Sequence, residues 1–138
     1  MKPLNGIKVI DLTHMLAGPY AGMVVADLGA EVVKIEPLVT GEMTRGLLKT
    51  DPNYSYKEFG AYFLTLNRNK KSVSLDLKSE IGLEIFYQLV KSADVVLNNF
   101  SAGVVKKLKI DFETLNTINP KIITCSITGF GETGPHSS

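Results

Sequence analysis

The run Ile7-Lys-Val-Ile-Asp-Leu12 is mostly apolar and β-branched, and the same kind of run returns as Glu31-Val-Val-Lys-Ile35. Between the two, Pro19 to Leu28 carries apolar residues at helical spacing, and Gly29 stands just beyond that segment. A strand, a helix and a second strand in this order are typical of a βαβ unit with parallel strands. This unit indicates the fold class, and the rest of the chain continues its pattern.

The remaining sequence alternates between strand-like and helix-like segments. We expect further strands over 72–77, 93–97 and 121–127, and further helices over 80–90 and 112–118. Ser79 and Asp111 directly precede these helices, where a side-chain oxygen can accept hydrogen bonds from the first turn. Because the strand runs are apolar nearly throughout, the sheet is expected to be covered on both faces. The sequence therefore predicts a Rossmann-like α/β fold with a mostly parallel sheet and helices on both faces.

The composition is that of one globular domain, with 138 residues, 44% apolar residues, 21% charged residues and a formal net charge of +1. A balanced charge gives no reason to expect a nucleic-acid partner. The sequence has no apolar run long enough to span a membrane and no signal-peptide stretch at its start, so we expect a cytoplasmic protein without a membrane partner. Cys125 lies in an apolar run and is expected to be a buried structural side chain.

Ligands of parallel sheets bind beyond the carboxyl ends of the strands. Four segments rich in Gly, Pro, Ser, Thr or Asn follow the expected strands, at 13–18, 37–46, 99–103 and 128–134. The first contains no G-x-G-x-x-G motif, which argues against a dinucleotide site of the usual kind. The helix start near Pro19 could hold an anion or a thioester carbonyl through its backbone amides, and a simple βα turn is an equally good interpretation.

Side chains that could form a metal or acid–base site are sparse. His14 and His136 are the only imidazoles, and neither has an acidic or metal-ligating partner at short spacing. The sequence contains no cluster of Cys, His, Asp and Glu, so no metal is predicted. Neither histidine is assigned a catalytic role.

Nine segments, in order and across nearly the whole chain, form a recognisable pattern: Leu4–Thr13, Ala17–Pro19, Ala26–Glu36, Gly41–Arg45, Asn67–Ser72, Leu75–Lys78, Ala93–Val96, Asn99–Phe100 and Gly129–Gly131. Together they resemble the opening of the family III CoA-transferases, and 41–46 is most similar to the formyl-CoA transferase branch. The same superfamily includes carnitine-linked CoA-transferases and α-methylacyl-CoA racemases. The resemblance implies that residues 1–138 are the N-terminal part of the large, coenzyme A-binding domain of a two-domain enzyme, and that this domain is incomplete here.

The resemblance also implies a coenzyme A site in the loops after the strands. Residues 16–17 match positions where the backbone meets the thioester end, 75–78 a segment beside the adenine and ribose, and 99–101 a second wall. Lys78 and Lys107 could pair with phosphate oxygens, although an exposed lysine is often only solvated. The implied binding residues are Leu16, Ala17, Leu75, Asp76, Leu77, Lys78, Asn99, Phe100, Ser101 and Lys107.

Two positions depart from the family pattern. Pro37 stands where many members have an arginine that can contact adenine and phosphate. Proline has no N–H donor, so we expect one coenzyme A contact to be absent or supplied by a neighbour. Leu16 replaces the glutamine found near the active site in formyl-CoA transferases. Both changes weaken the assignment to that branch.

The family's reactions need residues that lie farther along the chain than Ser138. In the transferases an aspartate attacks the acyl-CoA thioester and passes through mixed anhydride and aspartyl-CoA intermediates. In the racemases a histidine and an aspartate move a proton beside the thioester carbonyl. No catalytic residue is therefore assigned to this chain, and alone it is expected to be inactive.

The expected function is the coenzyme A-binding portion of an enzyme that transfers CoA between an acyl-CoA thioester and a carboxylic acid. The racemase branch and a non-catalytic CoA-binding or assembly fragment are the alternatives. The expected partners are the acyl-CoA, the carboxylic acid and the rest of the enzyme or a second chain, with an interlocked homodimer in the full-length form. Surface aromatic residues are expected to lack a partner in this chain alone, at Tyr54, Tyr56, Phe59, Tyr62 and Phe63.

Overall fold

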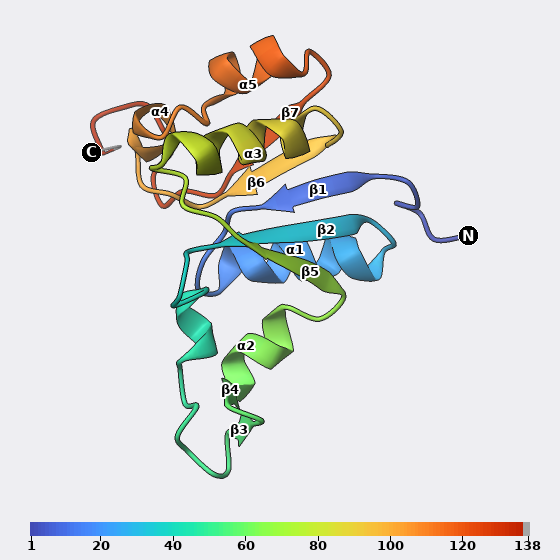
Figure 1. Ribbon diagram of the computed structural model, residues 1–138, viewed down its shortest axis with the longest axis vertical. Helices are drawn as coiled ribbons and strands as arrows, with labels where there is room; N and C mark the ends of the chain where they lie inside the picture. Colours follow the sequence, from blue (N-terminus) through green and yellow to red (C-terminus); the bar gives the residue numbers. More distant parts are fainter. Residues whose placement is uncertain (137–138) are drawn as a thin grey trace.

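A five-stranded sheet, parallel throughout, forms the centre of the computed structural model, which describes residues 1–136 (Figure 1). The strand order is β5-β2-β1-β6-β7, and every neighbouring pair is parallel. The order changes direction between β1 and β6, which is the topological switch point where such sheets bind ligands. The strands are β1 (Lys8–Asp11), β2 (Glu31–Glu36), β5 (Lys70–Ser74), β6 (Val95–Asn98) and β7 (Ile123–Ser126).

Helices cover both faces of the sheet, as predicted. On one face α1 (Ala17–Asp27) buries Ala26 against Val9 and Val32. On the other face α3 (Glu80–Val90) and α5 (Phe112–Ile118) form the larger cluster, in which Phe86 and Leu115 are 0% exposed. A short helix, α4 (Val104–Lys107), follows β6.

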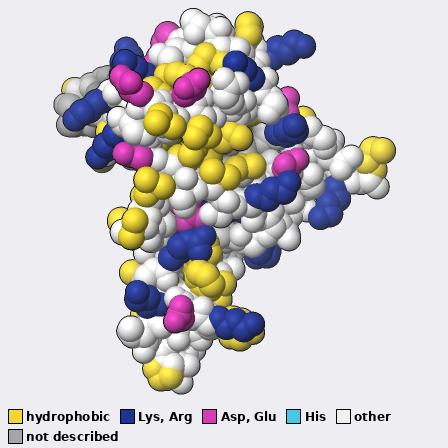
Figure 2. Space-filling model, viewed as in Figure 1, with side chains coloured by type: hydrophobic (Ala, Val, Ile, Leu, Met, Phe, Trp, Pro, Cys, Tyr) yellow, Lys and Arg dark blue, Asp and Glu magenta, His cyan; other side chains and the backbone are white. Residues whose placement is uncertain are grey.

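The helix α3 leaves part of its own face open. Figure 2 shows apolar side chains gathered where α3 meets β5, and Ile81 and Ile85 of α3 are 74% and 44% exposed.

No described helix has the length and apolar character needed to cross a membrane. Within residues 1–136 there is also no group of three or more His, Cys, Asp and Glu placed to hold a metal ion.

The predicted helix boundaries at α3 and α5 are confirmed, and each helix has its expected cap. Ser79 Oγ accepts a hydrogen bond from the amide of Gly82 at 3.0 Å, and the Asp111 carboxylate accepts one from the amide of Thr114 at 3.2 Å. Gly29 follows α1 with a φ of +107°, a backbone conformation that glycine adopts at little cost. The helix α1 begins at Ala17, two residues before the predicted start, because its first turn tolerates Pro19.

The strand expected over 72–77 begins and ends earlier in the chain than predicted. Strand β5 covers Lys70–Ser74 instead of 72–77. The sequence around Lys70 and Lys71 looks like a turn, but both lysines belong to the strand. Lys70 lies opposite Val32 of β2, and Lys71 lies opposite Val33. Leu75 then leaves the strand, although its amide still donates to the carbonyl of Glu36 at 3.0 Å.

The prediction that Cys125 is a buried side chain is wrong. Cys125 is exposed on β7, an outer strand of the sheet. In the described residues no strand lies beyond β7, and Ile123 on the same strand is 60% exposed. An apolar sequence run therefore does not distinguish this uncovered outer strand from a central one.

Residues 37–69 form a small projection beside the sheet (Figure 1). Tyr54, directly before β3, and Tyr56, in β3, are 56% and 62% exposed, as expected of surface aromatic residues, and Lys57 Nζ lies 5.2 Å from the ring centre of Tyr56. The guanidinium of Arg45 lies 4.0 Å from the ring centre of Phe63 and 5.5 Å from that of Phe59, so these two rings have a partner within the chain. The elements are η1 (Met43–Arg45), β3 (Ser55–Tyr56), β4 (Phe59–Gly60) and α2 (Ala61–Leu66).

A buried ionic group fixes the loop after the central strand. Asp11 is 0% exposed and accepts hydrogen bonds from the amide of Thr13 at 2.9 Å, from the Thr13 hydroxyl at 2.5 Å and from Lys70 Nζ at 2.8 Å. The same Lys70 ammonium donates to the carbonyl of Pro19 in α1 at 2.8 Å. Lys34 Nζ, 3.9 Å from Asp11, donates to the carbonyl of Thr13 at 2.7 Å. Residues of β1, β2 and β5 thus hold one turn of backbone.

A second buried group joins this loop to the segment after β2. Glu36 accepts two hydrogen bonds from the guanidinium of Arg45, at 2.5 and 2.6 Å, one from Ser72 Oγ at 2.6 Å and one from the amide of Glu42 at 2.8 Å. Glu42 in turn accepts from the amide of Met15 at 2.9 Å. Met15 has a φ of 67°, an unfavourable conformation for a side chain of its size. The Glu42 carboxylate holds the Met15 amide in that position.

The charge of Glu36 depends on these neighbours. Burial alone would raise the pKa of the carboxyl group, but the hydrogen bonds and positive charge of Arg45, with the donors from Ser72 and Glu42, lower the pKa from 4.5 to about 2. The carboxylate is therefore ionised at neutral pH. Its pairing stabilises the folded state above pH 4.5, and this contribution is lost as the pH falls from 4.5 toward 2.

We predict that Gly82→Ala destabilises the fold, although alanine is the better helix former by about 1 kcal/mol. A Cβ at Gly82 would overlap the carbonyl oxygen of Asp76, so α3 and the segment 75–78 must separate. We expect a loss of about 1–3 kcal/mol in the free energy of unfolding, measured by urea denaturation. Gly46→Ala is the control, because a Cβ there meets nothing closer than the Met43 carbonyl oxygen at 3.8 Å. Unchanged or increased stability of the Gly82 variant would contradict the packing described.

We predict that Glu36→Gln destabilises the fold by roughly 3 kcal/mol at pH 7, the equivalent of the lowered pKa. Urea denaturation at several pH values should also show less loss of stability than in the wild type between pH 4.5 and pH 2, where Glu36 takes up its proton. Glu84→Gln, on the exposed side of α3, is the matched control and should leave both properties unchanged. Equal acid sensitivity in the Glu36 variant and the wild type would show that another group dominates this pH range.

Candidate binding site at the strand ends

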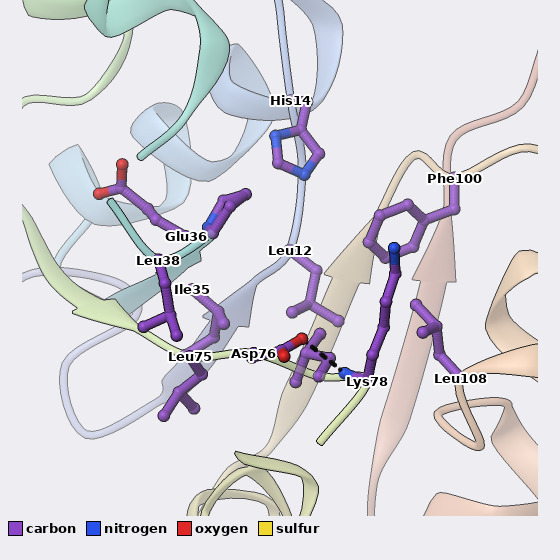
Figure 3. A pocket seen from close by; sticks show the side chains of 12 residues that line it. Leu12, His14, Ile35, Glu36, Leu38, Leu75, Asp76, Lys78, Phe100 and Leu108 are labelled. Atoms are coloured by element: carbon purple, nitrogen blue, oxygen red, sulfur yellow. Dashed lines mark hydrogen bonds between the residues drawn. The ribbon is translucent and has the colours of Figure 1, made fainter. Parts of the chain in front are cut away.

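The parallel register brings the carboxyl ends of the strands to one edge of the sheet, and a cavity of about 370 Å³ lies there (Figure 3). Its surface is mainly apolar, with a few polar side chains. This is the usual character of a site for a small molecule or cofactor. The lining residues come from the last two positions of β2, from the segments after β1, β2, β5 and β6 and from the end of α4: Leu12, His14, Ile35, Glu36, Pro37, Leu38, Leu75, Asp76, Leu77, Lys78, Phe100 and Leu108.

The segment 75–78 forms one wall of the cavity and is held by its own side chains. The Asp76 carboxylate accepts a hydrogen bond from the amide of Lys78 at 2.9 Å, and the Asp76 carbonyl accepts one from Ser79 Oγ at 2.9 Å. Figure 3 shows the Lys78 side chain extending toward Phe100 across the cavity. The wall therefore combines an ordered backbone with one cation that reaches into the opening.

A larger hollow of about 800 Å³ adjoins the first and shares Leu77, Lys78, Phe100 and Leu108 with it. It runs between the start of α3 and the helix α4, and Lys107 lies on its wall. The two predicted phosphate-binding cations, Lys78 and Lys107, thus line one continuous depression. Such a depression suits a ligand that has an apolar or aromatic part and negatively charged groups.

A third hollow of about 390 Å³ also has Phe100 in its wall. Asn99 and Ser101 line it together with the glycine-rich segment 127–131. Phe100 therefore lines all three hollows. The structure brings the predicted site residues 75–78, 99–101 and 107 to adjoining hollows at one edge of the sheet.

Leu16 and Ala17 are the two predicted site residues that line none of these hollows. They stand at the start of α1, where Leu16 is 53% exposed and no side chain caps the first turn. Asn99 connects this loop to the site, because its side chain accepts from the amide of His14 at 2.8 Å and donates to the His14 carbonyl at 2.8 Å.

Pro37, at the position of the family's arginine, forms part of the cavity wall. It contributes apolar surface and no donor, as its chemistry requires. Arg45 is the arginine nearest to Pro37 in the sequence. Its guanidinium donates hydrogen bonds to Glu36 and lies over the rings of Phe59 and Phe63. Of the residues that line the 370 Å³ cavity, Lys78 is the one that carries a positive side chain.

Sequence reasoning gave His14 little weight, yet it lines the cavity. Burial and the nearby Lys34 ammonium lower the pKa of His14 below its ordinary value of 6.5, and this outweighs the opposite effects of Glu42, Asp11 and Glu36. The imidazole is therefore neutral at pH 7. Its position in the loop after the first strand was the feature of the sequence that indicated a role in the site.

Other lining residues could not have been recognised from the sequence. Leu12, Ile35 and Leu108 form apolar surface of the cavity. Leu12 and Ile35 lie in apolar runs that are equally typical of the protein core, and Leu108 is a single apolar residue between two lysines. Their place at a strand or helix end matters for the site, and residue type alone does not reveal it.

The family model CoA-transferase family III matches residues 4–138 of the chain. The succinate–glutarate CoA-transferase of Agrobacterium fabrum is 44% identical over 140 residues, which cover 98% of this chain and 34% of that relative. The formyl-CoA:oxalate CoA-transferase of Afipia carboxidovorans is 42% identical, with 94% of this chain and 30% of the relative covered.

Among solved structures, a CaiB/BaiF family protein from Brucella suis superposes with a TM-score of 0.90 at 43% sequence identity. The superposition covers 99% of this chain and 36% of that one. This chain therefore spans about a third of the length of the relatives that it matches. The match extends over nearly all of its residues, in sequence and in fold, and the chain belongs to CoA-transferase family III.

Proposed function

We propose that this chain supplies the coenzyme A-binding part of an enzyme that transfers CoA between an acyl-CoA thioester and a carboxylic acid. The observation that carries the proposal is the continuous depression at the strand ends, where apolar surface adjoins Lys78 and Lys107. Coenzyme A combines an adenine ring, phosphate groups and a long, mainly uncharged pantetheine arm. The depression offers a chemically matching surface for each of these parts.

The proposed arrangement follows the chemistry of the wall residues. Adenine lies in the 370 Å³ cavity, against Leu75, Phe100 and the backbone of 75–78, where strand-end amides and carbonyls can recognise its edge. The phosphates lie toward Lys78 and Lys107. The pantetheine arm extends past Asn99 toward the start of α1, so that the thioester lies near the backbone of Leu16 and Ala17. Lys78 supplies the cation that Pro37 cannot.

Membership of the family and the names of the relatives support the choice of reaction. The Agrobacterium relative is named for succinate and glutarate, and the Afipia relative for formyl-CoA and oxalate. Each of these names describes CoA transfer to or from a carboxylate. We propose the same reaction class for the protein to which this chain contributes, with a short carboxylic acid as the acceptor.

The bond-breaking step is assigned to residues outside this chain. We propose that residues 1–138 form the N-terminal part of a large domain, and that the rest of the enzyme or a second chain brings the aspartate nucleophile to the thioester. We further propose an interlocked homodimer as the assembled form and the cytoplasm as its location. The contribution of this chain is to hold the CoA moiety and direct the thioester toward that partner.

We predict that isothermal titration calorimetry detects coenzyme A binding to the purified chain, and that Lys78→Ala and Lys107→Ala each weaken it about tenfold, since each removes a charged contact to phosphate. The affinity of the wild type should also fall as the salt concentration rises. Lys121→Ala is the matched control. This exposed lysine precedes β7 and therefore lies toward the amino ends of the strands, whereas the site lies at their carboxyl ends. The proposal is contradicted if the wild type does not bind coenzyme A, or if all three variants lose the same amount of coenzyme A affinity.

A further inference from the structure

His14 has a polar atom that the folded chain leaves unsatisfied. Among the described residues, its Nδ1 is the one buried side-chain nitrogen or oxygen without a hydrogen-bond partner. Buried polar atoms are almost always paired, because an unpaired one loses its interaction with water and gains nothing in return. The exception belongs to a residue that lines the candidate site, so the imidazole lies where a bound molecule can contact it.

The position of the imidazole is fixed from two sides. The backbone of His14 is held by the paired 2.8 Å hydrogen bonds with the Asn99 side chain, and its ring centre lies 5.9 Å from that of Phe100 at an angle of 55°. In Figure 3 the ring lies above Leu12. It thus stands between the apolar cavity and the loop that leads to Met15 and α1.

The charged neighbours of the ring determine what it can bind. Lys34 of β2 donates a hydrogen bond to the Thr13 carbonyl beside His14. Asp11 of β1, Glu36 of β2 and Glu42 before η1 supply negative charge nearby. Because burial and Lys34 lower the pKa of His14, the ring is neutral at pH 7. A neutral imidazole offers one donor and one acceptor nitrogen. It suits an uncharged amide or carbonyl group, whereas the phosphates of a ligand are better matched by Lys78 and Lys107.

We propose that His14 is a ligand-contacting residue whose imidazole forms a hydrogen bond with an amide or carbonyl group of the pantetheine arm of coenzyme A. The inference rests on the proposed function and adds a residue to it. The contact lies between the adenine cavity and the thioester end near Leu16. It gives the site a means of recognising the arm separately from the nucleotide.

The test compares two probes on the purified chain by isothermal titration calorimetry at pH 7. Coenzyme A carries the arm, and adenosine 3′,5′-bisphosphate is a nucleotide that lacks it. For His14→Phe, which keeps a ring without nitrogen, we expect coenzyme A affinity to fall about tenfold. Affinity for the bisphosphate should stay within about twofold of the wild type. His14→Gln, which keeps an amide donor and acceptor, should recover part of the lost coenzyme A affinity.

The outcomes distinguish a failure of the His14 contact from a failure of the proposed function. If the wild type binds neither probe, the proposed function fails and the inference fails with it. If the wild type binds both probes with equal affinity, or if His14→Phe binds coenzyme A as the wild type does, the site stands and the His14 contact is wrong. A parallel loss for both probes in His14→Phe would assign His14 a role in folding instead, and the bisphosphate affinity reports this directly.

Discussion

Asp11 ends the central strand with a carboxylate that is 0% exposed, and the site is arranged around the need to satisfy it. A buried charge is tolerated only when ionic and hydrogen-bonding partners replace water. Here the partners are Thr13 in the following loop and Lys70 from β5, with Lys34 of β2 3.9 Å away. Because Lys70 also binds a carbonyl of α1, the same interaction sets where that helix starts. The loop after β1 is therefore held by residues far apart in the sequence. Glu42 holds the same loop two residues beyond Thr13, where its carboxylate accepts a hydrogen bond from the amide of Met15.

Much of the fold could be predicted because its signals are local. The ends of α3 and α5 follow from apolar spacing and from the caps Ser79 and Asp111, whose oxygens bond to amides three residues away. Strand β5 was misplaced because Lys70 and Lys71 resemble a solvated turn. The buried partners of Lys70, which are the Asp11 carboxylate and the Pro19 carbonyl, are distant in the sequence. Exposure of Cys125 was missed for a related reason: the order of the strands in the sheet decides which apolar run lies at the outside.

The candidate site was predictable at the level of segments and less so at the level of atoms. Loops after parallel strands meet at one edge by geometry, so the convergence of 75–78 with 99–101 required no knowledge of side chains. The clamp between Asn99 and the backbone of His14 joins residues 85 positions apart, and no sequence spacing reveals it. The charge state of His14 likewise depends on Lys34, Glu42 and Asp11, which gather around it only in three dimensions.

The two outer strands of the sheet differ in how they resist aggregation. On β5 the exposed Lys71 pairs with Glu31, and a charged side chain at a sheet edge discourages another strand from pairing there. On β7 the residues Ile123–Ser126 carry no charge, and Ile123 is 60% exposed. Copies of the isolated chain that pair edge to edge will therefore use β7, where unpaired backbone and apolar surface coincide. A charge on this strand would oppose such pairing, so we expect Ile123→Lys to increase the solubility of the chain.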